Sequence, residues 1–154
     1  MRRLAELVGI AVLLPIILPL LFIAVTLHWV HRLVLYLLIW SLWLPKGKDA
    51  LVIYSDSPIW HDYMVREIIP LLERRAIILN LSERSRWPKW PFATHVFRSF
   101  GGGYEFNPMV VLFRPLCRAK FFRFWPGFRQ WKEHGDMASV DSLRREMCMY
   151  MERN

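Results

Sequence analysis

Two hydroxyls and a carboxylate follow a short apolar run, and this turn is the first candidate for chemistry in the chain. The run Ala-Leu-Val-Ile-Tyr at 50–54 precedes Ser55, Asp56 and Ser57, and Pro58 comes next. Proline favours the first position of a helix, so the turn is expected at a helix N-terminus, where free N–H groups attract anions. The two hydroxyls could bind a phosphate or a nucleotide there. Asp56 would repel a phosphate unless a metal ion lay between them.

The same turn has a simpler explanation. Serine is a good N-cap, so Ser57 could accept a hydrogen bond from the first turn of the helix. The carboxylate of Asp56 would then complement the positive end of the helix dipole. The stretch matches neither of the glycine-rich patterns of nucleotide-binding loops. Capping is therefore the favoured interpretation, and a site for a phosphorylated ligand is the alternative.

Catalytic and metal-binding patterns are weak in the rest of the chain. A nucleophile–base pair would require the fold to bring a histidine to Ser55, Ser57 or Cys117, and no local spacing demands this. Cys117 and Cys148 have no metal-ligand spacing and are expected to be free thiols, with a single disulfide as the alternative. The sequence predicts no catalytic residue and no metal site, and it identifies no cofactor.

Two stretches interleave aromatic rings with bases, and they predict a surface that binds a partner protein or lipid headgroups. Nucleic-acid sites use stacking rings and cationic side chains in the same way, but neither stretch matches an RNA-recognition pattern, so nucleic acid is not expected. Some of these rings must pack in the core, because alternate residues of a strand face inward. The residues predicted for this surface are Arg84, Trp87, Lys89, Trp90, Arg123, Trp125, Arg129, Trp131 and Lys132.

The elements that must position these residues follow an α/β order. Apolar runs at 50–54 and 76–81 flank a helical pattern, and this β–α–β unit predicts parallel strands with a right-handed crossover. We therefore predict a small open, mostly parallel α/β sheet with C-terminal helices. The other predicted strands are 94–100, 109–113 and 120–125, and the other predicted helices are 128–134 and 140–153, the last capped by Ser139 or Asp141.

The N-terminal segment is predicted to be a membrane anchor. Only four charged or titratable side chains interrupt an apolar run over 4–44. One helix of that length would be about 61 Å long, twice the roughly 30 Å hydrocarbon core of a bilayer, so two pieces are expected. Residues 7–27 are predicted to span the membrane, and residues 28–44 to form an interfacial or re-entrant helix. The alternative is a helical hairpin that returns the chain to its starting side.

Aromatic and basic residues indicate where the second piece should meet the headgroup layer. Tryptophan and tyrosine prefer this layer, and lysine and arginine accumulate on its cytoplasmic side. Bases after the predicted span outnumber those before it, so the domain is predicted on the cytoplasmic side. The residues predicted for the interface are Trp29, Arg32, Tyr36, Trp40, Trp43, Lys46 and Lys48.

The charge of the chain suggests what lies near it. Of the net charge of +8, residues 66–132 contribute thirteen Lys or Arg against four Asp or Glu. Beside a bilayer such a region is attracted to anionic lipid headgroups, although the same pattern suits a solvated basic surface. The sequence thus predicts an anchor at 1–48 and a small basic α/β domain at 49–154.

Two functions fit these patterns. The leading hypothesis is a membrane-anchored, non-catalytic interaction domain, an accessory or structural subunit of a larger membrane protein assembly. It rests on the many aromatic and basic side chains of a small domain, which are typical of a partner surface. The alternative is a small membrane-tethered enzyme or sensor that binds a phosphorylated ligand or nucleotide at Ser55, Asp56 and Ser57.

Overall fold

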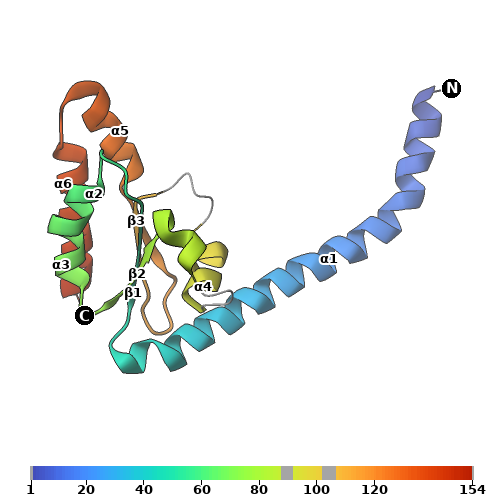
Figure 1. Ribbon diagram of the computed structural model, residues 1–154. Coiled ribbons are helices and arrows are strands. Elements are labelled where there is room, and N and C mark those ends of the chain that lie inside the picture. The colour runs from blue at the N-terminus through green and yellow to red at the C-terminus, as the bar shows by residue number, and fades with distance from the viewer. Residues whose placement is uncertain (1, 88–91, 102–106, 154) are drawn as a thin grey trace. The chain divides into compact units, whose positions relative to one another are not determined.

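The computed structural model describes residues 2–87, 92–101 and 107–153, and the chain divides into two compact units, residues 1–38 and residues 39–154. The elements run in the following order (Figure 1): α1 (Arg2–Leu42), η1 (Leu44–Lys46), β1 (Ala50–Tyr54), α2 (His61–Tyr63), η2 (Met64–Ile68), α3 (Ile69–Leu72), β2 (Ala76–Asn80), η3 (Leu81–Arg86), α4 (Phe92–Phe100), β3 (Met109–Leu112), β4 (Lys120–Arg123), α5 (Trp125–His134) and α6 (Ala138–Glu152).

α1 is one continuous helix of 41 residues. The predicted division into a span at 7–27 and a separate helix at 28–44 is wrong, because no turn interrupts the helix between these pieces. For the same reason the hairpin alternative is wrong. From Leu14 to Val34 the helix exposes its apolar side chains. Among the residues described, it is the one helix that is long and apolar enough to cross a membrane.

The second unit is built on a four-stranded sheet in the order β2-β1-β3-β4. β1 and β2 are parallel, with Ala50 opposite Ala76 and Tyr54 opposite Asn80. β3 is antiparallel to β1, and β4 is antiparallel to β3. The sheet is therefore mixed, and the predicted mostly parallel arrangement is wrong. An apolar run shows that both faces of a strand are buried, but it does not encode the direction of the strand.

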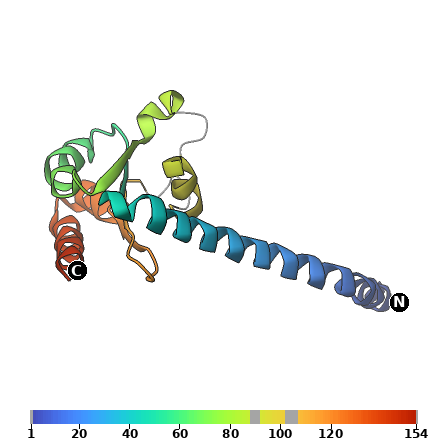
Figure 2. The same ribbon diagram turned by 90° about the horizontal axis from the view of Figure 1, so that it is seen from below.

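One face of the sheet holds a cluster of buried apolar residues. Ala50 and Val52 of β1, with their neighbours on β3 and β4, pack against the helices from the β1–β2 crossover and the C-terminal part of the chain. Figures 1 and 2 show α3 and α6 on this side and α4 on the opposite side. The helical side chains of the cluster are Met64, Ile68, Leu72, Phe128, Val140 and Met147.

The opposite face is covered by α4 and by the last turn of α1. Leu51 and Ile53 of β1 point to this face by strand alternation, and both are fully buried. The ring of Trp43 meets those of Phe92 and Phe113 edge-on, at centroid distances of 5.2 and 6.0 Å. Ile39, on the last turn of α1, is fully buried as well. The core of the domain thus begins inside α1, before the predicted boundary at residue 49.

α4 replaces the strand that was predicted at 94–100. Ala93, Val96, Phe97 and Phe100 recur at the spacing of one helical face, and the last three of them are buried. The β-branched and aromatic residues favoured a strand locally, but only a helix brings these apolar side chains to the same side. The element order is therefore β α β α β β α α, with one strand fewer than predicted.

The two C-terminal helices are present, with a different cap. α5 ends at Gly135, whose φ of 73° suits glycine, as the predicted break between the helices requires. α6 begins at Ala138, whose N–H donates to Asp136 Oδ1 at 2.8 Å, so the predicted capping by Ser139 or Asp141 is wrong. Asp141 instead accepts a hydrogen bond from the Tyr63 hydroxyl at 3.1 Å. Burial first, and then this bond, raise the pKa of Tyr63 to about 12.

The position of Trp43 gives a stability prediction. Trp43→Ala should lower the free energy of unfolding of the domain by about 3–5 kcal/mol, since it removes a large buried ring from the core. Trp29→Ala is the matched control, because it removes the same kind of ring from α1, where Trp29 is 62% exposed. Thermal unfolding of the full chain in mild detergent, followed by circular dichroism, measures both. Equal stability of the two variants would contradict the packing of Trp43 in the core.

Candidate functional site

The carboxyl ends of β1 and β2 meet at one edge of the sheet, and a group of hydrogen-bonded polar side chains lies there. Because the two strands are parallel and in register from Ala50 to Tyr54, the segments that follow them leave the sheet side by side. β3 begins at the same edge, since Met109 is opposite Ile53. In α/β sheets, ligands bind outside the carboxyl ends of strands where successive crossovers diverge, and β1 is such a strand. This edge is the candidate site.

Asn80, the last residue of β2, organises the edge. Its Oδ1 accepts a hydrogen bond from the N–H of Ser82 at 2.9 Å and so caps η3. Its Nδ2 donates to Asp56 Oδ1 at 2.8 Å. The N–H of Asp56 in turn donates to the Ser82 hydroxyl at 2.9 Å. These three bonds join the segment after β1 to the segment after β2.

His61, at the start of α2, lies against the same carboxylate. Its Nδ1 is 3.3 Å from Asp56 Oδ1, a contact that becomes an ion pair when the imidazole is protonated. The imidazole ring also packs near the Tyr54 ring, with the centroids 5.9 Å apart. Burial raises the pKa of Tyr54, and the nearby carboxylates of Asp56 and Glu83 raise it further. The edge is therefore an electronegative environment.

The two serines of the predicted ligand site already have partners. The Ser55 hydroxyl accepts a hydrogen bond from Asn107 Nδ2 at 2.7 Å, which joins the segment after β1 to the segment before β3. The Ser57 hydroxyl accepts from the N–H of Ile59 at 3.4 Å, and its carbonyl oxygen accepts from Trp60 and His61. The Ser57 side chain thus supports the turn before α2, but the predicted helix N-cap at Ser57 is wrong, because α2 begins at His61 after Trp60 and no side chain caps it.

Beside these residues lies an open cavity of about 690 Å³, lined by Asp56, Pro58, His61, Asp62, Asn80 and Glu83. Three carboxylates face it, so an approaching phosphate would meet like charges with one imidazole to offset them. The lining suits a cationic or hydroxyl-rich group better than an anion. In the part of the chain that the structure describes, no three His, Cys, Asp or Glu side chains come together as metal ligands.

The sequence located Ser55, Asp56 and Ser57 but missed the residues that bind them. Asn80 closes a predicted apolar strand, and His61 entered the sequence analysis only among the histidines that a nucleophile would need as its base. The signal that could have found Asn80 is its position at the end of the second strand of a parallel pair. Asn107 could not have been found, because its contact with Ser55 depends on β3 lying beside β1 in the antiparallel direction.

The residues predicted for the membrane interface have different positions. Trp29 is exposed on α1, and Lys46 is exposed at the end of η1. Arg32, Tyr36 and Trp40 are half-buried. Trp43 lies in the domain core, so its assignment to the headgroup layer is wrong. The Lys48 ammonium donates to the carbonyl oxygens of Arg74 and Ala76, at 3.0 and 3.2 Å, and thus holds the start of β2.

The residues of the predicted aromatic and basic surface also differ in how far they are exposed. Arg84, Arg123, Arg129 and Lys132 are exposed, with Arg129 paired to Glu133 at 2.9 Å. The tryptophans are half-buried: Trp125 packs edge-on against Trp60 at 5.7 Å, and Trp131 lies 6.5 Å from Phe128. Trp87 is half-buried too, while Lys89 and Trp90 lie outside the described residues. The bases therefore form the surface, and several of the rings belong to the packing beneath it.

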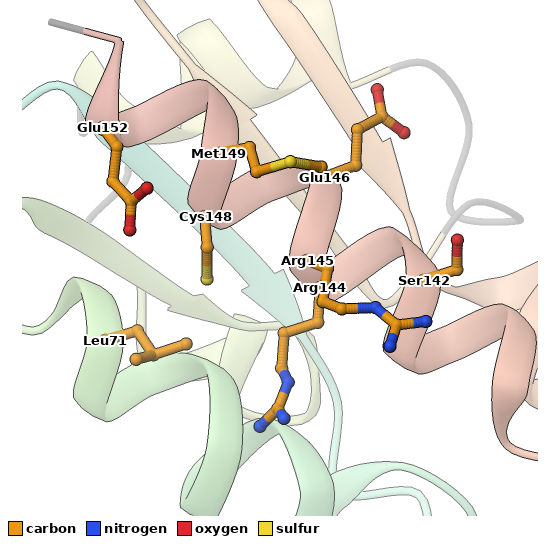
Figure 3. Close-up of a pocket in the computed structure, with 8 residues that line it drawn as sticks. All are labelled: Leu71, Ser142, Arg144, Arg145, Glu146, Cys148, Met149 and Glu152. Atoms are coloured by element: carbon orange, nitrogen blue, oxygen red, sulfur yellow. The ribbon is translucent and has the colours of Figure 1, made fainter.

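A second cavity, of about 670 Å³, lies between α3 and α6 (Figure 3). Leu71 of α3 lies across it from Cys148 of α6. Leu71 and Met149 are 48% and 55% exposed, so the groove presents apolar surface to solvent. The sequence did not single out this groove.

Comparison of the chain with protein-family models, with curated proteins and with solved structures finds no match.

The hydrogen bonds of Asn80 give a second stability prediction. Asn80→Ala should cost about 1–2 kcal/mol, because it removes the cap of η3 and a partner of Asp56 together. Ser57→Ala should cost less, about 1 kcal/mol or below, since its single bond is long. Ser85→Ala, an exposed change in η3, serves as the control. Urea unfolding of the full chain in detergent ranks the three variants, and a larger cost at Ser57 than at Asn80 would contradict the central position of Asn80.

Proposed function

We propose that the chain is a membrane-anchored domain that works by binding a partner rather than by catalysis. The observation that carries the proposal is the exposed apolar length of α1. Its large apolar side chains between Leu14 and Val34, among them Phe22 at 71% and Leu27 at 63%, are exposed. Each such side chain gains roughly 1.5–3 kcal/mol on leaving water, so a bilayer is the solvent that suits this segment.

The polar edge of the sheet supports binding over catalysis. The Ser55 hydroxyl accepts a hydrogen bond from Asn107, the Ser57 hydroxyl accepts one from Ile59 within its own turn, and Asp56 is held by Asn80 and His61. These groups fix the loops around β1. A nucleophile needs a base within hydrogen-bond reach, and the partner of His61 here is a carboxylate. The edge is better suited to holding the domain together than to chemistry.

The surface of the domain supports a partner. The groove between α3 and α6 exposes Leu71 and Met149, and exposed apolar surface of this kind marks contact sites. Exposed bases such as Arg84 and Lys132 suit anionic lipid headgroups or an acidic partner surface. We infer that the domain is an accessory or structural part of a membrane assembly, on the cytoplasmic side, where bases accumulate after a span.

The anchor is tested by extraction. The full chain should stay in the membrane pellet after carbonate and after high salt, because burial of apolar side chains in lipid does not depend on charge screening. Leu20→Arg combined with Ile23→Arg should release it or prevent insertion, since each charge at the centre of a span costs about 2.5–3.5 kcal/mol. Immunoblots of pellet and supernatant measure this. Release of the unaltered chain by carbonate alone would refute the anchor.

The sidedness is tested by labelling of Cys117, which is exposed on the domain. In a Cys148→Ser background, a maleimide that cannot cross membranes should label the chain only after the cells are permeabilised. The Cys117→Ser/Cys148→Ser chain is the control for labelling of other groups. Equal labelling of intact and permeabilised cells would place the domain on the outer side.

A further inference from the structure

The outer face of α6 has a regular pattern. The helix buries Val140 and Met147 against the sheet. Residues on its other side line the groove shared with α3, and their spacings of three, four and three keep them on one face (Figure 3). These residues are Ser142, Arg145, Met149 and Glu152. The face is therefore a narrow stripe with Met149 in its middle and opposite charges on either side.

The charges around the groove differ in what they already bind. Arg144 pairs with Glu67, and Glu146 pairs with Lys120 at 3.0 Å, so these four side chains tie α6 to the rest of the domain. Arg145 and Glu152 are exposed and form no ion pair with other described residues. Both point away from the sheet on the stripe, where a partner could reach them.

The positions of these two charges are the informative feature. Arg145 and Glu152 are two helical turns apart, about 10.5 Å along the helix, with Cys148 and Met149 halfway between them. A two-fold rotation through this midpoint exchanges the two charge positions between two antiparallel copies of the helix. Each arginine then lies opposite a glutamate, and Met149 lies near the axis beside Leu71. The stripe is thus complementary to itself, as a two-fold interface requires.

We propose that α6 and Leu71 form a homodimer surface, on which a second copy of this chain packs its α6 in the antiparallel direction. Arg145 of each copy pairs with Glu152 of the other, and Met149 and Leu71 fill the centre. The proposal rests on the proposed function and names its partner. One helix and a groove bury less than the roughly 1,200 Å² of a stable interface. Tethering in one membrane offsets this, because it raises the effective concentration of each copy for the other.

Cross-linking at Cys148 tests the proposal. The full chain, carrying Cys117→Ser, is placed in vesicles at low density and treated with a short bismaleimide. The unaltered stripe should give a covalent dimer, because Cys148 lies next to the two-fold axis. Arg145→Glu and Glu152→Arg should each lower the dimer yield about tenfold, since each turns two attractive pairs into two repulsive ones. Arg118→Glu, a charge reversal at an exposed residue between β3 and β4, should leave the yield unchanged.

Mixing the two variants gives the decisive result. A chain with Arg145→Glu and a chain with Glu152→Arg have opposite charges at both positions, so differently tagged copies should cross-link to each other at the yield of the unaltered chain. The double variant Arg145→Glu/Glu152→Arg should recover the homodimer. Recovery also shows that the single variants are folded.

Three outcomes would overturn the dimer: no Cys148 cross-link in the unaltered chain, equal yields in the reversed variants, or no recovery on mixing. Each of these leaves the anchor intact, because carbonate extraction tests the anchor separately. A chain that stays in the membrane but fails all three dimer criteria binds something other than itself through this domain.

Discussion

The complete burial of β1 is the constraint on which the rest of the domain depends. Its residues from Ala50 to Ile53 have no exposed surface, because β2 and β3 pair with both edges and helices cover both faces. Such a strand cannot form until elements from distant parts of the chain surround it. The β1–β2 crossover and the C-terminal helices supply one face, and α4 with the end of α1 supplies the other. The segment after β1 is therefore held in place by its neighbours, and Asp56 and Ser55 accept hydrogen bonds from Asn80 and Asn107.

The surroundings that the side chains of α1 suit change before the helix ends. From Leu14 the helix presents side chains that suit hydrocarbon, yet Ile39 and Trp43 belong to the core of a domain that suits water. A tryptophan near the end of an apolar helix is usually assigned to the headgroup layer, since its ring is amphipathic. Here the ring of Trp43 packs edge-on against Phe92 and Phe113 instead. The last turn of α1 and Trp43 after it are therefore part of the domain.

The sequence was sufficient for the features that depend on local pattern. The apolar runs located β1 and β2, the spacing of apolar residues located the crossover helix, and Gly135 located the break between α5 and α6. It failed where packing overrides local preference. The residues Thr94 to Phe100 have strand propensity, but the helical spacing of Val96, Phe97 and Phe100 prevailed. The direction of β3 could not be predicted either, because the strand is apolar on both faces in either direction.

For a related reason, the sequence predicted only part of the candidate site. A hydroxyl or carboxylate after a strand is visible in the sequence, and so Ser55, Asp56 and Ser57 were found. Whether such groups are free or already bonded depends on which strands become neighbours. Asn80 comes from the parallel neighbour and Asn107 from the antiparallel one, and each removes hydrogen-bonding capacity from the turn. The polar residues that suggested a ligand site thus help to hold the loops around β1 together.

These contacts determine which polar side chains are already bonded within the domain and which remain exposed for a partner. Polar groups that converge from three strands bond to one another, so the edge of the sheet has little left to offer an anion. The charges of α6 that face the domain are likewise used, by Glu67 and Lys120. What remains on the described surface of α6 is a stripe in which an exposed methionine lies between an arginine and a glutamate. A stripe whose two charges have opposite sign and equal distance from its centre needs no second kind of protein to complement it. The proposed anchor would hold copies of the chain in one membrane and so raise their effective concentration for one another, which favours contact through a small self-complementary surface.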